Sequence, residues 1–579
     1  MQLLIILLVV ISGLFSSSHA TAVTVNRVNG SMNVVYVDFS VPGYAVPLEL
    51  LRSYNSITAL NETSGWSGTF GWGWTSPLET TLTVTPEKSV ILRDGGTGNN
   101  IIFRAGQLES KAVDGFIHSV KKLYFEQKKG RKLSESELSQ LALPEKMSTQ
   151  LRTDPQFRSE IAGRYKISTA PSVDVLISSD YGYQTVQYRN NQWFREKDGI
   201  TQVFDKDGRM VRQIDKNGFY FDYLYSSNNK LQVSEIHDQD RVTSLKLVWR
   251  GDRVVSVVDN RGRKSTYEYD GLGNLSKVTD SNQQSYAFRY ENKKFPHLLT
   301  TIEYLSESSN KNQVSREFRY DDAGLLVYHR DKEGSETLYS YGRGSSNPDS
   351  NFWTRTTYKT GNSQQETYEE FFLKARADGS KYLYKQETKE LGNNSTTVFT
   401  ACCGKPLQIT KNGEVTNFKY TEDGLLKEKV GPSEDIQIEY DQMWKKISKV
   451  TQNRVTSEYA YDAKGNLVKA SNSKNERVSL SYDKYGRIIE MTDGNKKKIL
   501  FKYGTQGKPI LITDQTIGTV KISYDPEGRI LKTETVLSAF KNRRPTQEQS
   551  QEVVRKIMKG FQSLLDIIRP AGLGLTAGS

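Results

Sequence analysis

Residues Ser481–Gly504 read "SYDKYGRIIEMTDGNKKKILFKYG", and the tyrosines near the two ends, Tyr482 and Tyr503, are 21 residues apart. Each tyrosine is followed by a polar sequence, "YDKYGR" or "YGTQGK". Asp and Gly favour turns, because the Asp side chain bonds nearby backbone N–H groups and Gly tolerates a positive φ. The residues before each tyrosine alternate between apolar and polar, as in a strand with one buried face. The stretch therefore predicts a repeating strand–turn–strand unit.

The same 21-residue spacing continues on both sides of this stretch. A unit of two strands and two turns cannot bury its own apolar face, so neighbouring units must stack on one another. Upstream the unit recurs with more drift, beginning with "FDKDGR" at Phe204. We therefore expect a mainly β fold built around one long curved sheet. The markers are Tyr440, Tyr461, Tyr482, Tyr503 and Tyr524, and the turn glycines are Gly465, Gly486, Gly507 and Gly528.

Composition changes along the 579-residue chain and divides it into five expected parts. Residues 107–164 are rich in Lys, Glu, Ser and Leu at helical spacing, and "SESE" at 134–137 fits a capping box. Residues 346–394 lose the repeat rhythm, so we expect degenerate repeats with longer loops there. The expected parts are a signal peptide at 1–20, a β region at 21–105, a helical insertion at 106–166, the repeats at 167–535, and a C-terminal amphipathic helix with a tail at 536–579.

The N-terminus resembles a secretory signal. Leu3–Leu14 is an apolar run too short to span a bilayer, and small residues, Ser18 and Ala20, occupy the positions that a signal peptidase reads. No Lys or Arg precedes Arg27, which departs from the usual pattern. No later apolar run predicts a transmembrane helix. We expect cleavage after Ala20 and a mature protein that is secreted, periplasmic or on the cell surface.

Near the C-terminus an apolar stripe at helical spacing predicts a helix from about residue 546 to 568, ended by Pro570. Two interpretations stay open. The helix docks on the sheet or caps its open end, or it binds a partner or a membrane surface. The 44 residues after 535 are too few to hold an ordinary enzyme.

No catalytic or metal-binding pattern is evident. The four histidines outside the signal peptide, at 118, 237, 297 and 329, have no metal-ligand or nucleophile spacing, and P-loop, Rossmann and Gly-x-Ser-x-Gly motifs are absent. A repeated Asp-x-x-Gly could bind Ca²⁺, but the spacing of known Ca²⁺ loops is missing. We therefore expect no enzyme activity, no metal and no cofactor. An enzyme within the helical insertion is a third alternative that no residue set requires.

The two cysteines, Cys402 and Cys403, are adjacent in "TACCGKP". Aligned on the repeat, Thr400 takes the tyrosine position, and Gly404 with Lys405 takes the Gly-Arg position, so the cysteines fill the turn. An exported protein favours disulfides, yet neighbouring Cα atoms lie about 3.8 Å apart, below the usual range of about 4.4–6.8 Å. The hypotheses are a strained vicinal disulfide, or two thiols that fill a turn or meet another chain.

The charge is basic, with 79 Lys and Arg against 67 Asp and Glu and a net charge of +12. The signs are interleaved, which is typical of a solvated surface. The alternative is attraction to an anionic partner such as wall polymer or lipid headgroups. No nucleic-acid motif is present, so we do not expect nucleic-acid binding.

The Tyr-Asp-x-x-Gly-Arg or Gly-Asn unit resembles the YD repeat of Rhs proteins over residues 193–536. These proteins include bacterial wall-associated proteins, polymorphic toxin carriers and shells of insecticidal toxin complexes, and animal teneurins share the repeat. The preceding β region resembles the segment before the repeats in such proteins. It matches at Pro42, Gly43, Pro47, Leu48, Arg52, Tyr54, Asn55, Ser56, Phe70, Gly71, Gly73 and Trp74.

The resemblance implies a ribbon of strands that spirals into a hollow shell. Larger members enclose a toxin and end in a core that, in many, releases it by cleavage with paired aspartates. No such Asp-Pro-rich core is evident here, so we expect neither a payload nor self-cleavage. The repeat units are also few for a closed shell, so we expect an open or partly closed one. Two functions follow. One is a non-enzymatic scaffold or binding module for glycans or partner proteins at the bacterial surface. The alternative is a carrier or shell component of a toxin system without a large C-terminal toxin.

Overall fold

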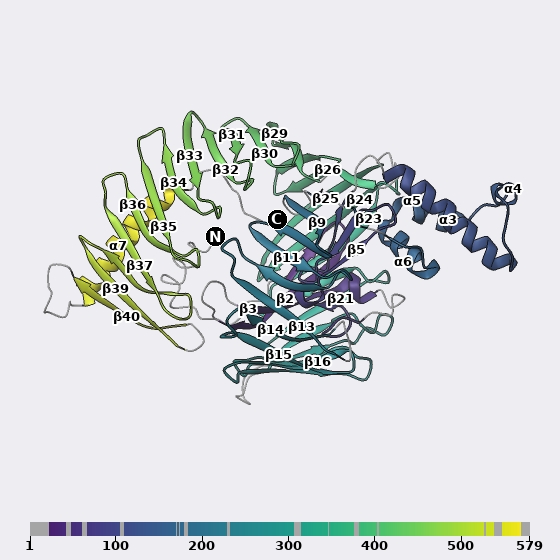
Figure 1. The fold of residues 1–579 in the computed structure, drawn as a ribbon, viewed down its shortest axis with the longest axis horizontal. Coiled ribbons are helices and arrows are strands. Elements are labelled where there is room, and N and C mark those ends of the chain that lie inside the picture. Colours follow the sequence, from purple (N-terminus) through teal and green to yellow (C-terminus); the bar gives the residue numbers. More distant parts are fainter. Residues whose placement is uncertain are drawn as a thin grey trace.

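The computed structural model is mainly antiparallel β-structure, as the repeats predict (Figure 1). The described residues are 23–41, 48–60, 67–104, 109–169, 171–172, 174–178, 183–227, 232–305, 314–344, 347–375, 381–401, 404–525, 529–537 and 547–568.

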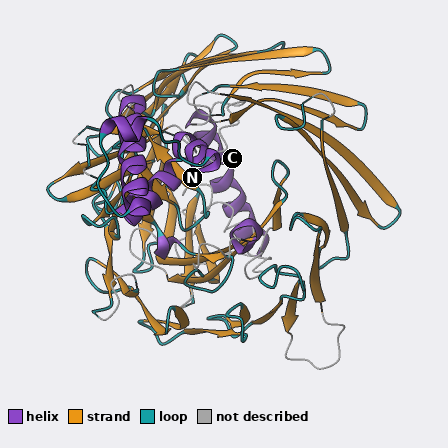
Figure 2. Ribbon diagram, turned by 90° about the vertical axis from the view of Figure 1, so that its right-hand side faces the viewer, coloured by secondary structure: helices purple, strands orange, loops and turns teal. Residues whose placement is uncertain are grey.

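One continuous sheet accounts for most of the chain. Each strand from β8 to β40 pairs with the next strand in the sequence, always antiparallel. No ladder in the described part of the chain joins β40 to β8, so the sheet is open. Figure 2 shows the strands following a wide curve. Neighbouring strands are twisted relative to one another, and this twist accumulates over a long sheet. The prediction of an open YD-repeat sheet is confirmed.

The strands of this sheet are short and regular in the C-terminal half and more varied before it. Their bounds are β8 Leu176–Ser178, β9 Gln184–Arg189, β10 Gln192–Lys197, β11 Ile200–Phe204, β12 Met210–Ile214, β13 Tyr220–Tyr225, β14 Val233–Asp238, β15 Ser244–Arg250, β16 Arg253–Asp259, β17 Lys264–Tyr269, β18 Leu275–Thr279, β19 Ser285–Arg289, β20 Thr301–Leu305, β21 Val314–Tyr320, β22 Leu326–Arg330, β23 Glu336–Arg343, β24 Asn351–Thr360, β25 Ser363–Ala375, β26 Lys381–Glu390, β27 Asn393–Phe399, β28 Pro406–Lys411, β29 Glu414–Tyr420, β30 Leu426–Val430, β31 Asp435–Tyr440, β32 Ile447–Gln452, β33 Val455–Tyr461, β34 Leu467–Asn472, β35 Arg477–Tyr482, β36 Ile488–Asp493, β37 Lys498–Tyr503, β38 Pro509–Asp514, β39 Gly518–Tyr524 and β40 Ile530–Leu537.

The turn after each marker tyrosine is built by local contacts. In the unit that begins at Tyr482, the Asp483 carboxylate accepts hydrogen bonds from the backbone N–H groups of Tyr485 and Arg487 at 2.9 and 3.0 Å. The Arg487 guanidinium donates to the other oxygen of Asp483 at 2.7 Å. Gly486 has a φ of +73°, which a side chain would strain. The repeated Asp and Gly are therefore explained by the turn itself.

A smaller β region precedes the repeats. Strands β1 (Val23–Asn26), β2 (Ser31–Val41), β3 (Leu48–Asn55) and β4 (Trp74–Thr75) form one sheet, with α2 (Ser56–Leu60) and the 3-10 helix η2 (Pro77–Glu79) beside it. Strands β5 (Thr81–Val84), β6 (Val90–Arg93) and β7 (Asn100–Phe103) form a second sheet.

The first of these sheets packs on one face of the repeat sheet and forms the largest hydrophobic core with it. This face carries the marker tyrosines and is called the inner face below. Tyr54 shows how the two parts are joined: its hydroxyl donates to the carbonyl of His297 and accepts from the N–H of Leu299, both at 2.9 Å. The indole of Trp74 donates to the hydroxyl of Tyr290 at 2.9 Å. The aromatic residues before the repeats therefore anchor this region to the repeat sheet.

Four helices lie between residues 109 and 165 and project from one end of the molecule (Figure 1). They are α3 (Glu109–Lys129), α4 (Glu135–Ser139), α5 (Glu145–Thr153) and α6 (Pro155–Tyr165). The capping box expected in "SESE" is present, formed by Ser134 and Glu137. A buried ion pair of 2.7 Å between Arg158 and Glu87 fastens α6 to the turn between β5 and β6.

The expectation of longer loops at 346–394 is wrong. Strands β24, β25 and β26 have 10, 13 and 10 residues, the last two being joined through residues 376–380, which lie outside the described part. Pairing between β24 and β25 continues up to Thr360 and Ser363. The polar residues that hide the repeat rhythm here occupy long paired strands rather than loops.

Helix α7 (Gln547–Ile568) docks on the inner face, so the first of the two interpretations of this helix holds for the described residues. Val553 and Ile557 are buried against Val520 and Ile522 of β39, and Leu564 packs among residues of β34 to β37. Within the part of the chain that the structure describes, no helix is both long and apolar enough to cross a bilayer.

Candidate functional site

The marker tyrosines form hydrogen bonds to the backbone of the preceding repeat unit. The hydroxyl of Tyr482 donates to the carbonyl of Leu467, the first residue of β34, at 2.6 Å. Trp249 takes the same position with its indole N–H, which donates to Val233 at 2.8 Å. The same bond recurs from Tyr225 to Met210, Tyr269 to Val254, Tyr341 to Leu326, Tyr420 to Pro406, Tyr440 to Leu426, Tyr461 to Ile447, Tyr503 to Ile488 and Tyr524 to Pro509.

These tyrosines are therefore not a glycan-binding surface. Burial raises the pKa of Tyr440 and Tyr524 to about 12, and it raises the pKa of Tyr482 further. Their hydroxyls are used as structural donors within the sheet. A binding role has to come from other aromatic residues.

Such residues gather on the opposite, outer face of β24, β25 and β26. We call this group the outer patch. Its orientation follows from strand alternation: Thr354 and Thr356 are buried on the inner face, so Trp353 and Arg355 point outward. The members of the outer patch are Trp353, Arg355, Tyr368, Phe372, Lys374, Tyr384, Lys385 and Lys389, all partly or fully exposed.

Rings and ammonium groups alternate in the outer patch. The ring centroids of Trp353 and Tyr368 lie 5.8 Å apart, and those of Phe372 and Tyr384 lie 6.4 Å apart. The Lys385 ammonium lies 3.8 Å from the centre of the Phe372 ring. Rings that keep one face in solvent can stack on sugars, and adjacent cations attract anionic groups. Two of the cations are paired on the same face, Arg355 with Glu366 at 3.5 Å and Lys385 with Glu387 at 2.8 Å. The outer patch therefore combines exposed rings with charges of both signs.

Two backbone features create the outer patch. Gly342 lies opposite Trp353 in the register of β23 and β24, and a Cβ on Gly342 would come within 2.3 Å of the indole. The absence of a side chain at Gly342 gives the indole its place on the sheet. A register shift between Phe372 and Leu373 places the rings of Phe372 and Tyr384 near each other.

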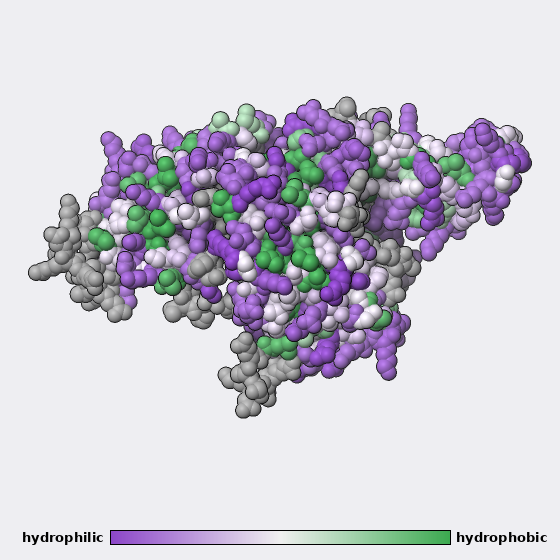
Figure 3. Space-filling model, turned by 60° about the horizontal axis from the view of Figure 1, so that its bottom comes forward, coloured by the Kyte–Doolittle hydropathy of each residue, from purple (hydrophilic) through white to green (hydrophobic). Residues whose placement is uncertain are grey.

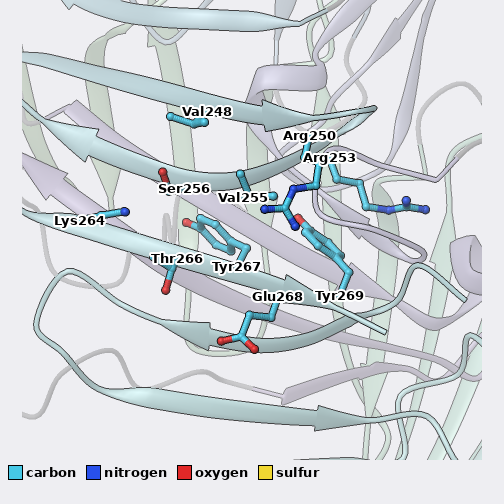
Figure 4. Close-up of a pocket in the computed structure, with 10 residues that line it drawn as sticks. All are labelled: Val248, Arg250, Arg253, Val255, Ser256, Lys264, Thr266, Tyr267, Glu268 and Tyr269. Atoms are coloured by element: carbon cyan, nitrogen blue, oxygen red, sulfur yellow. The ribbon is translucent and has the colours of Figure 1, made fainter. Parts of the chain in front are cut away.

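A depression of about 650 Å³ lies on the sheet at β15, β16 and β17 (Figure 4). Basic side chains of Arg250, Arg253 and Lys264 and hydroxyls of Ser256 and Thr266 line it. Its lining contains neither His nor Cys and a single carboxylate, so these residues provide no paired acid and base. The face of the molecule that Figure 3 shows is mostly hydrophilic, with small separate apolar patches.

The inner face is not covered everywhere. The first sheet covers its N-terminal part, and α7 covers β34 to β40. Between them, none of the described residues of β26, β27, β28, β29 and β30 is buried. Within the described part of the chain, no other segment covers this stretch of the inner face.

The residues singled out from the sequence lie mostly in structural positions. Cys402, Cys403 and Gly528 fall outside the described residues, so the disulfide hypothesis stays a prediction. Gly465, Gly486 and Gly507 occupy turns with φ between +69° and +73°. Among the described residues no cluster of His, Cys, Asp and Glu is arranged to hold a metal ion.

Sequence reasoning missed the outer patch. Its aromatic residues stand in a segment where the 21-residue spacing is lost, and cross-strand distances decide which rings meet. The available signal was the period-two pattern in which Trp353 and Arg355 alternate with Thr354 and Thr356. This pattern predicts that Trp353 lies on the face opposite the threonines.

Comparisons with known proteins place three segments of the chain. Residues 23–103 match a domain of unknown function (DUF6531), residues 250–285 match the RHS repeat, and residues 426–542 match the teneurin YD-shell. No curated protein sequence matches the chain.

Solved structures that are similar to the chain include components of a toxin. A Tc holotoxin pore of Photorhabdus luminescens aligns with a TM-score of 0.38 and 12% identity over 90% of this chain and 27% of that chain. A TcdB2-TccC3-TEV structure aligns with a TM-score of 0.40 and 12% identity over 89% of this chain and 28% of that chain. The chain thus spans between 27% and 28% of the length of these two structures.

The RHS-repeat match falls on β16 to β18, and the YD-shell match falls on β30 to β40, where the tyrosine hydroxyls tie one unit to the next. The sequence spacing, the turn chemistry and these two matches agree with one another. Two segments of the chain are thus similar to the RHS repeat and to the teneurin YD-shell, which supports the resemblance to the Rhs/YD-repeat family.

Proposed function

We propose that this chain is a non-enzymatic scaffold of the Rhs/YD type, exported to the bacterial surface, which binds a glycan through the outer patch. The observation that carries the proposal is the placement of four aromatic rings and four cations on one exposed face of three long strands. The rings offer stacking surfaces spaced along the sheet. Lys374 and Lys389, which form no ion pair among the described residues, suit an anionic sugar group.

Binding of purified wall or envelope polysaccharide to the mature chain tests this proposal. Isothermal titration or retention on immobilised polysaccharide measures it. Replacement of Trp353 and Tyr368 by Ala removes one pair of rings and should weaken retention by at least tenfold. Tyr220 lies on the outer face of β13 near Arg212, whose guanidinium is 3.8 Å from its ring centre, so Tyr220→Ala is a matched control that keeps binding. Equal binding by all variants, or no retention at low salt, would refute the glycan proposal.

The uncovered stretch of the inner face favours a second candidate function, a carrier that holds a partner polypeptide. Strands β26 to β30 present Thr397, Ile409 and Phe418 on this face, between the regions covered by the chain's own segments. A mixed polar and apolar surface of this kind suits an extended polypeptide more than a rigid folded domain.

Hydrogen exchange of the full chain with and without a co-expressed partner tests the carrier. Protection confined to β26–β30 supports it, and Phe418→Asp should abolish that protection. Protection that appears only over the outer patch would instead favour the surface scaffold.

Export is part of both proposals. Mass spectrometry of the protein recovered from outside the cytoplasm measures its first residue. An N-terminus at Thr21 supports the signal peptide, whereas a chain that stays in the cytoplasm and begins at Met1 contradicts export.

A further inference from the structure

A cluster of buried polar side chains lies where β2 meets the inner face of β19 to β22. Tyr36 on β2 is 3% exposed and Arg316 on β21 is 8% exposed. The ring centroids of Tyr36 and Tyr286 lie 5.6 Å apart, and those of Tyr286 and Tyr304 lie 5.7 Å apart. The cluster therefore sits inside the interface that joins the N-terminal region to the repeats.

Strand register brings Arg316 close to two other polar groups. Arg316 lies opposite Ile302, so Tyr304 is its diagonal neighbour on the same face of β20. Phe318 lies opposite His329, which makes His329 the diagonal neighbour on the other side. Such neighbours are about 7–8 Å apart at the backbone, within reach of long and aromatic side chains.

Four polar atoms of this cluster lack partners in the described part of the chain, whereas the hydroxyl of Tyr286 donates to Gln284 at 3.0 Å. Within the described residues, no hydrogen bond reaches the hydroxyls of Tyr36 and Tyr304, the Nε of Arg316 or the Nε2 of His329. Burial, followed by the nearby Arg316 charge, lowers the pKa of His329 to about 4, so this imidazole is neutral at pH 7. A phenol, a guanidinium and a neutral imidazole can all donate hydrogen bonds, and the guanidinium can only donate.

Arg316 also differs from the other buried arginines of the described chain. Arg52 is paired with Asp38 at 2.7 Å and Arg158 with Glu87 at 2.7 Å. Arg195 donates to the side-chain oxygens of Gln184 and Gln202. Within the described residues no carboxylate pairs with Arg316, and its buried Nε has no acceptor. A buried cation without a counter-charge is costly, so the site favours a negative ligand.

We propose that this cluster binds a small inorganic anion of the size of chloride, held by the Arg316 guanidinium and the hydroxyls of Tyr36 and Tyr304. The donors come from β2, β20 and β21, so the bound anion joins the first sheet to the repeat sheet. Since the anion binds only the folded chain, it stabilises that chain according to its concentration.

Thermal unfolding of the full chain tests the proposal when sodium chloride replaces sodium gluconate at constant ionic strength. We expect the melting temperature to rise with chloride and then to saturate. Arg316→Gln should remove this rise. Arg319→Gln is the matched control, because Arg319 is three residues away, 68% exposed and on the outer face, and it should keep the rise. A rise that persists in Arg316→Gln overturns the proposal.

Tyr36→Phe provides a second variant in case Arg316→Gln does not fold, because it keeps the ring and removes one donor. We expect it to need a higher chloride concentration for half of the shift. Crystals grown in sodium bromide give a direct reading, with an anomalous peak expected among Tyr36, Tyr304 and Arg316. Water in that place without an anomalous peak, or chloride dependence that is unchanged in Tyr36→Phe, would overturn the proposal.

Discussion

The hydroxyl of Tyr482 and the carbonyl of Leu467 form a hydrogen bond of 2.6 Å. Leu467 ends the turn that follows Tyr461, so each marker tyrosine secures the turn of the unit before it. The bond explains why tyrosine rather than phenylalanine recurs: the ring fills the inner face and the hydroxyl satisfies a strand-end carbonyl.

Tyr482→Phe should therefore lower the free energy of unfolding by about 1 kcal/mol, the net value of one such hydrogen bond. Urea unfolding followed by fluorescence measures the change. Tyr220→Phe, on the outer face, is the control and should have a smaller effect. Equal effects of the two changes would show that the hydroxyl of Tyr482 does not stabilise the turn.

Substitutions at Asp483 separate turn bonding from ion pairing. Asp483→Ala removes the acceptor for two backbone N–H groups and should cost about 1–3 kcal/mol. Asp483→Asn keeps an oxygen for those groups and loses only the charge on the Arg487 pair, so its cost should be smaller. Denaturant midpoints measure both variants, and an Asn variant as unstable as the Ala variant would assign the effect to charge.

Ile557→Asp should release α7 from the sheet. Ile557 is 3% exposed and packs on Val520 and Ile522, and a buried carboxylate without a partner is strongly unfavourable there. Hydrogen exchange should then increase in β39 and in α7, while β13 to β23 keep their protection. Unchanged exchange in β39 would show that the helix does not shield it.

Glu79 should give the stability a pH dependence. Burial raises the pKa of this carboxyl from 4.5 to about 7, and the backbone N–H of Thr69 donates to it. The folded chain therefore binds more protons than the unfolded chain between pH 4.5 and 7, so this group's contribution to stability falls as pH rises through that window.

Glu79→Gln keeps an oxygen for Thr69 and removes the titration. The stability of the variant relative to the wild type should thus increase between pH 4.5 and 8, by a few kcal/mol at most. Thermal unfolding across this range measures it. Parallel curves for the two proteins would contradict a raised pKa.

The repeats were predictable because their contacts are local. The bond from Asp483 to the N–H of Arg487 spans four residues, and the tyrosine tether spans about one unit, so both leave a regular trace in the sequence. Stacking of identical units then follows from the need to bury one face of each.

Distant contacts left no such trace. Tyr54 forms hydrogen bonds with His297 and Leu299, which are more than 240 residues away in the sequence. Neither segment has a sequence pattern that predicts this contact. The outer patch depends on Gly342 lying opposite Trp353. This placement is set by the register of β23 and β24, which the sequence does not show. Residues 346–394 suggested loops because Ser, Asn and Gln are poor strand formers, yet pairing along the neighbouring strands overrides that preference.

The tether from Tyr482 to Leu467 reaches one unit back and no further. Excision of a complete 21-residue segment, such as 462–482, would join Tyr461 to Asp483 and leave a junction of the same chemistry. Whole repeats can therefore be gained or lost during evolution, and their number sets how far the sheet extends along its curve.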